Sequence, residues 1–106
     1  MLQISAESFE SEVIECEGVV LVEFTADWCG VCKRSEKLFS DAEKELTDVK
    51  FCFVDIDRDK ELADKFSVRG VPTIVVFCSG EVKSRKTGAL TKADLYSMLG
   101  RKPAGI

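Results

Sequence analysis

Histidine is absent from the 106-residue sequence, and its absence excludes or restricts two kinds of site. A cysteine hydrolase needs a histidine as the base that activates its nucleophile, so this class is excluded. Zinc sites often combine cysteine with histidine, and here thiolates would have to supply most of the ligands. Zinc would therefore need a second close cysteine pair, which the chain lacks, or a second copy of the chain.

Long hydrophobic runs and basic clusters are also missing. Apolar runs such as residues 19–22 are far shorter than the roughly 18 residues that span a bilayer. The net charge is −4, from 15 basic and 19 acidic residues, and no stripe of Lys and Arg could neutralise phosphates. We therefore expect neither a membrane nor a nucleic acid as a partner.

The first residues lack the basic start and the apolar stretch of a secretory signal peptide. This favours a cytoplasmic location, where the five cysteines would mostly remain thiols. Their odd number and their spacing do not match the disulfide framework of a small secreted protein.

Length and composition indicate one folded unit. Hydrophobic residues make up 45% of the chain and charged residues 32%, a balance typical of globular proteins. The length suits one core and is too short for two. We expect a single domain over residues 1–106, present as a monomer, with a frayed tail at residues 101–106.

Strand patterns and helix patterns alternate along the chain. Buried strands are predicted at residues 19–24, 51–56 and 71–77, which are rich in β-branched and other apolar side chains. The turn residues Ser79 and Gly80 predict a hairpin with residues 81–87. This order indicates an α/β fold whose mixed sheet is parallel in its first part and has helices on both faces.

Helical spacing of apolar residues predicts four helices: residues 8–16, residues 32–47, a helix capped by Asp59 with Leu62 and Phe66 inside, and a last helix after Thr91. The first helix carries an apolar stripe that includes Phe9 and Val13. Thr91 and Asp94 form a capping box, and Gly100 ends the last helix.

Cys29 and Cys32 lie where a predicted strand passes into a predicted helix. The unpaired N–H groups and partial positive charge of a helix N-terminus stabilise a thiolate on Cys29 more than one on Cys32. Cys29 is therefore predicted to attack a disulfide, and Cys32, one turn inside the helix, to resolve the mixed disulfide. The alternative interpretation is half of a zinc site, which uses the same spacing.

Glu23 interrupts an apolar strand a few residues before the cysteine pair. A carboxyl group buried there would have a raised pKa and could accept the proton that Cys32 must lose in order to attack. The alternative is a carboxylate at a sheet edge, partly solvated and without a role.

Four segments resemble signatures of the thioredoxin family, in order and at the family's spacing: residues 22–33, 69–73, 77–81 and 87–90. The resemblance covers nearly the whole chain. It implies the thioredoxin fold, with a central mixed sheet of about five strands flanked by about four helices. It also implies a protein-disulfide reductase, active in redox homeostasis without a cofactor or metal. A thioredoxin reductase, linked to NADPH or to ferredoxin, would restore the dithiol.

The resemblance further implies that the peptide bond before Pro72 is cis and that an apolar face receives the disulfide of a target protein. The residues implied for this face are Trp28, Gly30, Val31, Val71, Pro72, Gly88 and Ala89. Packing in the core is the alternative interpretation of Trp28.

Four positions depart from the common family pattern. Val31 and Lys37 replace prolines, the second of which normally kinks the helix. Glu23 replaces an aspartate, and Phe53 replaces a lysine that often accompanies that carboxylate. Without this cation, Glu23 should be harder to ionise. The backbone N–H of Val31 is expected to donate a hydrogen bond to the Cys29 sulfur.

The other three cysteines are interpreted as inert. Cys16 and Cys52 fall on apolar patterns and are expected to act as small core residues. Cys78, beside a turn, is expected to be more exposed, and it is our choice for any regulatory or intermolecular disulfide.

Two other functions remain as alternatives. An oxidant or isomerase on the same fold is disfavoured by the missing signal peptide. A protein that uses the fold only as an interaction scaffold would have no need of both sulfurs.

Overall fold

The computed structural model describes residues 1–102. In chain order its elements are β1 (Leu2–Gln3), α1 (Ala6–Phe9), the π-helical segment η1 (Glu10–Ile14), β2 (Val19–Thr25), α2 (Gly30–Glu45), β3 (Val49–Asp55), α3 (Lys60–Lys65), β4 (Thr73–Cys78), β5 (Glu81–Thr87) and α4 (Lys92–Met98). None of the helices within these residues is long and apolar enough to cross a membrane.

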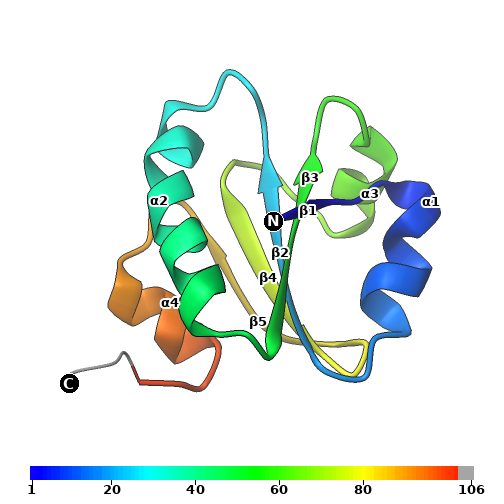
Figure 1. Cartoon of the computed structure of the whole chain (residues 1–106). Helices are drawn as coiled ribbons and strands as arrows, with labels where there is room; N and C mark the ends of the chain where they lie inside the picture. The colour runs from blue at the N-terminus through cyan, green and yellow to red at the C-terminus, as the bar shows by residue number, and fades with distance from the viewer. Residues whose placement is uncertain (103–106) are drawn as a thin grey trace.

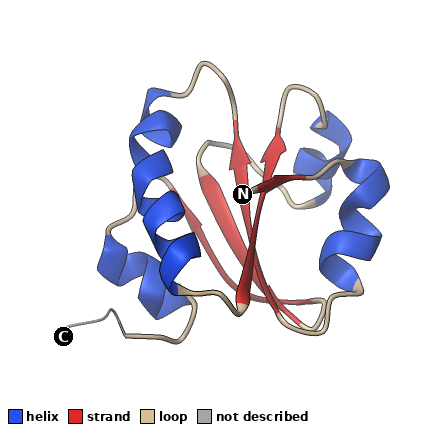
Figure 2. Ribbon diagram, viewed as in Figure 1, coloured by secondary structure: helices blue, strands red, loops and turns tan. Residues whose placement is uncertain are grey.

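The strands described form a five-stranded sheet in the order β1-β3-β2-β4-β5. β1, β3 and β2 are parallel, β4 is antiparallel to β2, and β5 is antiparallel to β4. Figures 1 and 2 show α1 and α3 against one face of the sheet, and α2 and α4 against the other. The predicted α/β class, with a mixed sheet and helices on both faces, is confirmed.

The side chains of the central strand β2 divide between two cores. Val20 and Val22 pack with residues of α1 and α3. Leu21 packs with residues of α2 and α4. Because side chains alternate along a strand, Glu23 lies on the same face as Leu21, beneath α2. The fold therefore places a carboxyl group between the sheet and the helix that follows it.

The N-terminal region differs from the prediction. β1 was not predicted, because two residues that pair with β3 are too few to show a strand pattern. The first helix begins at Ala6 instead of residue 8, and the side-chain oxygen of Ser8 accepts a hydrogen bond from the Ser5 N–H before it. From Glu10 onward the helix is π-helical. Phe9 and Val13 are buried, as the apolar stripe predicted.

The Asp59 side chain was predicted to cap the helix that follows it, α3, and this is wrong. Asp59 does precede α3, but its side chain accepts no hydrogen bond from that helix. Its Oδ1 accepts a hydrogen bond from the N–H of Ala6 at 3.0 Å, in the first turn of α1. The carboxylate thus joins α1 to α3, two helices on the same face of the sheet (Figure 1).

The C-terminal helix begins as predicted. The Thr91 hydroxyl accepts a hydrogen bond from the N–H of Asp94 at 3.1 Å, and the Asp94 carboxylate accepts one from the N–H of Thr91 at 3.0 Å. Gly100, with φ +70°, follows the helix. The predicted fraying is wrong at Arg101, which pairs with Asp48 at 2.6 Å. Lys102 is exposed, and the part of that prediction that concerns residues 103–106 lies outside the described residues.

Candidate active site

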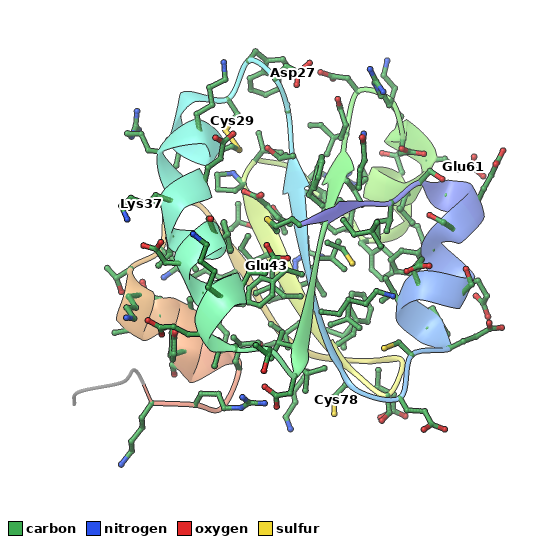
Figure 3. All side chains as sticks on the ribbon, in the orientation of Figure 1. Asp27, Cys29, Lys37, Glu43, Glu61 and Cys78 are labelled. Atoms are coloured by element: carbon green, nitrogen blue, oxygen red, sulfur yellow. A yellow bond between two sulfur atoms is a disulfide. The ribbon has the colours of Figure 1, made fainter. Side chains whose placement is uncertain are left out.

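Cys29 and Cys32 lie at the carboxyl end of β2, where α2 begins (Figure 3). α2 starts two residues earlier than predicted, at Gly30, because Cys29 itself occupies the N-cap position. The sulfurs of the two cysteines are bonded, and their Cα atoms are 5.3 Å apart. The structure thus brings together the two predicted redox cysteines.

The N-terminus of α2 provides the hydrogen bond to the Cys29 sulfur. The N–H of Cys32, at the third helical position, donates to Cys29 Sγ at 3.1 Å. The sequence predicted Val31 as the donor, and this is wrong: an N-cap side chain can accept from the second or the third helical N–H, and here the third one, that of Cys32, makes the bond. When the disulfide is reduced, the same N–H and the helix dipole would stabilise a Cys29 thiolate.

The face around the cysteines is built from three loops. The Val71–Pro72 peptide bond is cis, as the resemblance implied. The N–H of Gly88 donates to the carbonyl of Pro72 at 2.8 Å, which joins the end of β5 to the start of β4. Val31 and Val71 pack, partly buried, against the cluster that contains both cysteines. Gly30 and Ala89 are exposed.

Trp28 is 68% exposed, so the alternative of core packing is wrong. Its indole N–H donates to Asp57 Oδ2 at 2.9 Å, and the N–H of Asp57 donates to Asp55 Oδ1 at 2.9 Å. This chain of hydrogen bonds holds a large apolar ring on the surface beside Cys29. Sequence reasoning missed Asp57, since nothing in its local pattern relates it to a residue 29 positions earlier.

Glu23 is 5% exposed and lies in the central strand, so the alternative of an edge carboxylate is wrong. Its neighbours in register are Phe53 on β3 and Ile74 on β4, which are both uncharged. Its Oε2 has no hydrogen-bond partner among the described residues. Burial, and then the charge of Glu36, raise the pKa of Glu23 from 4.5 to about 7. The predicted direction of this shift is confirmed.

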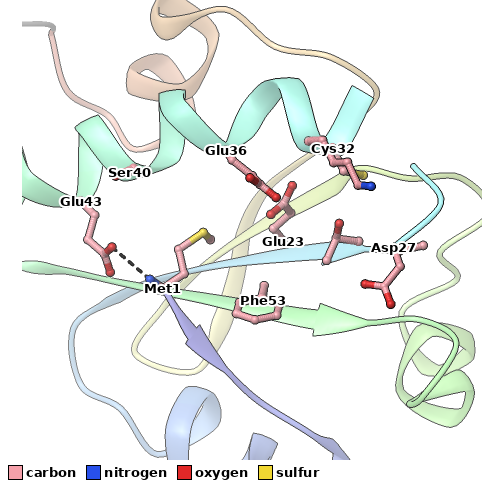
Figure 4. A pocket seen from close by; sticks show the side chains of 11 residues that line it. Met1, Glu23, Asp27, Cys32, Glu36, Ser40, Glu43 and Phe53 are labelled. Carbon is pink, nitrogen blue, oxygen red and sulfur yellow. Dashed lines mark hydrogen bonds and ion pairs between the residues drawn. The ribbon is translucent and has the colours of Figure 1, made fainter. Parts of the chain in front are cut away.

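A cavity of about 350 Å³ separates Glu23 from α2 (Figure 4). Its lining residues are Met1, Glu23, Thr25, Ala26, Asp27, Cys32, Lys33, Glu36, Ser40, Glu43 and Phe53. Glu23 and Cys32 therefore face one space, and Phe53 forms an apolar part of its wall. The arrangement allows proton exchange between the carboxyl group and the thiol of a reduced Cys32.

Comparisons with known proteins agree with this geometry. The family model described as Thioredoxin matches residues 1–101. A thioredoxin of Pseudomonas aeruginosa is 34% identical over 100 residues, which cover 93% of each chain. A thioredoxin of Rhodospirillum rubrum is 36% identical over 97 residues, 91% of this chain and 93% of the relative. One of Rickettsia typhi is 37% identical over 95 residues, 89% of this chain and 90% of the relative.

The chain belongs to the thioredoxin family. It is a dithiol–disulfide oxidoreductase that acts as a protein-disulfide reductase, and the Cys29–Cys32 pair fits the redox-active site of this family. Membership also implies disulfide-containing targets and a reductase that restores the dithiol.

Two of the residues that depart from the usual thioredoxin pattern, Lys37 and Phe53, lie on different sides of the site. Lys37 lies on the exposed side of α2, pairs with Asp41 at 2.9 Å, and leaves α2 as one helix from Gly30 to Glu45. Phe53 stands beside Glu23, so no cation from that position faces the carboxyl group. The charge that helps to raise the pKa of Glu23 belongs to another acid, Glu36, which sequence reasoning missed.

The remaining cysteines are thiols away from this thioredoxin site. Cys52 is fully buried, as predicted, and burial raises its pKa to about 11. Cys16 packs against the same core and is partly buried. Cys78 is partly buried like Cys16, and Figure 3 shows it at the opposite end of the sheet from Cys29. Within residues 1–102, no three His, Cys, Asp or Glu side chains form a group suited to a metal ion.

Proposed function

We propose that Cys29 is the nucleophile, Cys32 the resolving thiol and Glu23 the proton acceptor in the reduction of target disulfides. The observation that carries this proposal is the position of Cys29 Sγ at the N-terminus of α2, with Cys32 between it and the Glu23 cavity. The helix terminus stabilises an anionic Cys29 sulfur, and the buried Glu23 carboxyl group accepts the proton of Cys32.

The reaction proceeds in two exchanges. The Cys29 thiolate attacks one sulfur of the target, the target's S–S bond breaks, and one target thiolate leaves. The Cys32 thiol then gives its proton to the Glu23 carboxylate, and its thiolate attacks Cys29 Sγ. The mixed disulfide breaks, and the second target thiolate leaves and takes a proton from water. The target gains two electrons and the cysteine pair loses two.

The binding surface proposed for targets is the face around the cysteines: Trp28, Gly30, Val31, Val71, Pro72, Gly88 and Ala89. Exposure of the Trp28 ring supports this proposal, because a large apolar side chain on the surface favours contact with another protein. The cis bond at Pro72 and the packing of Val71 near the sulfurs support it as well.

The protein is proposed to work in the cytoplasm as a monomer of one domain. The match of the family model to residues 1–101 supports a single domain. Three free thiols, Cys16, Cys52 and Cys78, are typical of a reducing compartment. The reductase that restores the dithiol draws on NADPH or on ferredoxin, and a comparison of the two electron sources in a coupled assay would identify which.

Reduction of insulin with dithiothreitol as the electron source tests this function. The protein should accelerate the precipitation of insulin chains over dithiothreitol alone, and the Cys29→Ser variant should not. A scaffold protein on the same fold would give no acceleration with either chain, and that result would contradict the proposal.

A further inference from the structure

Two carboxyl groups face each other across the cavity behind Cys32. Glu23 rises from β2 and Glu36 descends from α2, and their side chains point toward one another in Figure 4. Glu36 lies four residues after Cys32, so the two occupy the same side of the helix. The cavity is thus bordered by the resolving sulfur, the buried carboxyl group and a second acid.

The charged surroundings of Glu23 are mostly acidic. From α2 the cavity is lined by Lys33, Glu36 and Glu43, and from the loop before α2 by Asp27. The amine of Met1 also lines it but pairs with Glu43 at 3.0 Å. β3 and β4 contribute only the uncharged side chains of Phe53 and Ile74 beside Glu23.

Within residues 1–102, no hydrogen bond stabilises the charged form of Glu23. Its Oε2 is buried without a partner among the described residues, although the side chain borders a cavity large enough for water. A like charge across such a space favours the protonated carboxyl group, since two carboxylates in one site resist ionising together. Glu36, on the other side of this space, is exposed to solvent.

We propose that Glu36 holds the proton on Glu23 and thereby sets the pH above which Cys32 can be deprotonated and resolve the mixed disulfide. This rests on the proposed role of Glu23 as the proton acceptor. Glu36 acts through Glu23, as a positioning residue for its proton. Below that pH the mixed disulfide with a target persists longer, because Glu23 already carries a proton and cannot take the one from Cys32.

The resolving step can be followed in one mixing experiment. Reduced protein is mixed with dithionitrobenzoate, whose coloured thiolate is released once when Cys29 attacks and again when Cys32 resolves. The rate of the second release is measured against pH. In the unchanged protein this rate should fall as the pH drops through about 7, the pKa of Glu23.

Glu36→Gln removes the charge but keeps the size and exposure of the side chain. The acid limb of the second release should move to lower pH by about half a unit or more, while the first release serves as an internal reference. Glu36→Lys should move the limb further in the same direction. NMR titration of the Glu23 carboxyl carbon should show the same order of midpoints, which a merely structural effect would not produce.

Glu43→Gln is the matched control, because it removes a carboxylate from the same helix and the same cavity lining. The acid limb of Glu43→Gln should stay within a few tenths of a pH unit of the limb of the unchanged protein, since Glu43 forms an ion pair with the Met1 amine. An unmoved limb in Glu36→Gln, or an equal shift in Glu43→Gln, would overturn the role of Glu36.

The underlying role of Glu23 is tested separately by Glu23→Gln. If this variant loses the acid limb but Glu36→Gln does not move it, only the inference about Glu36 fails. If Glu23→Gln keeps the limb unchanged, the proposed proton transfer by Glu23 fails as well.

Discussion

At the scale of the residue, the charge on Glu23 opposes folding. The folded protein raises its pKa from 4.5 to about 7, so between these values the native state binds more protons than the unfolded state. The free energy of unfolding must then fall as the pH rises through this range. The shift corresponds to roughly 3 to 4 kcal/mol, because one pKa unit is worth roughly 1.4 kcal/mol.

Glu23→Gln should remove this fall in the free energy of unfolding. The side chain keeps its shape but cannot ionise, so the free energy of unfolding of the oxidised variant should exceed that of the unchanged protein at neutral and higher pH. The excess should shrink as the pH falls through 4.5, since the carboxyl group is protonated in both states only below that value. Urea unfolding at several pH values measures the difference, and a constant difference across the range would contradict the burial argument.

At the scale of the element, the first turn of α2 governs the stability of the reduced form. The N–H groups of this turn, including that of Val31, surround the Cys29 sulfur with partial positive charge, although the direct hydrogen bond comes from Cys32. A proline at position 31 would remove one N–H group. The hydrogen bond that the Ser35 hydroxyl donates to the carbonyl of residue 31 would remain, since proline keeps its carbonyl.

Val31→Pro should therefore be the stronger reductant. With less stabilisation of the thiolate, its potential should be more negative than that of the unchanged protein by a few tens of millivolts, where 30 mV corresponds to about 1.4 kcal/mol. Glu23 and Phe53 are the same in both proteins, so the comparison isolates one position. Equilibration of both against a glutathione or dithiothreitol series decides it. A variant that is equally reducing, or less so, would refute the account of this turn.

Elements that depend on neighbouring residues were predicted from the sequence, and features that depend on distant residues were not. β2, β3 and β4 were predicted because each is a run of apolar, β-branched residues. α4 was predicted because Thr91 and Asp94 cap each other within one turn. β1 was missed because its two residues form a strand only through their pairing with β3. The partner of Asp59 was missed for the same reason, since it lies on another helix.

At the scale of the whole molecule, some site residues could be predicted from the sequence and others could not. Cys29, Cys32 and Glu23 stood out because each breaks or ends a pattern in the sequence. Glu36 and Asp57 did not, because their importance depends on which helix face covers β2 and on where the Trp28 ring settles. The fold gathers these residues at the end of the sheet where β2 passes into α2, opposite the end that holds Cys78 (Figure 3).

The central claim, that Cys29 attacks and Cys32 resolves, is tested most directly by trapping. Cys32→Ser should still attack disulfides but have no second thiolate to release them, so covalent adducts with targets should accumulate from a cell extract and dissolve on reduction. Cys29→Ser should give few adducts, because Cys32 lies inside the first turn of α2 and borders the Glu23 cavity, whereas Cys29 occupies the N-cap position that favours a thiolate. Equal trapping by the two variants, or full turnover by Cys32→Ser, would contradict the assignment.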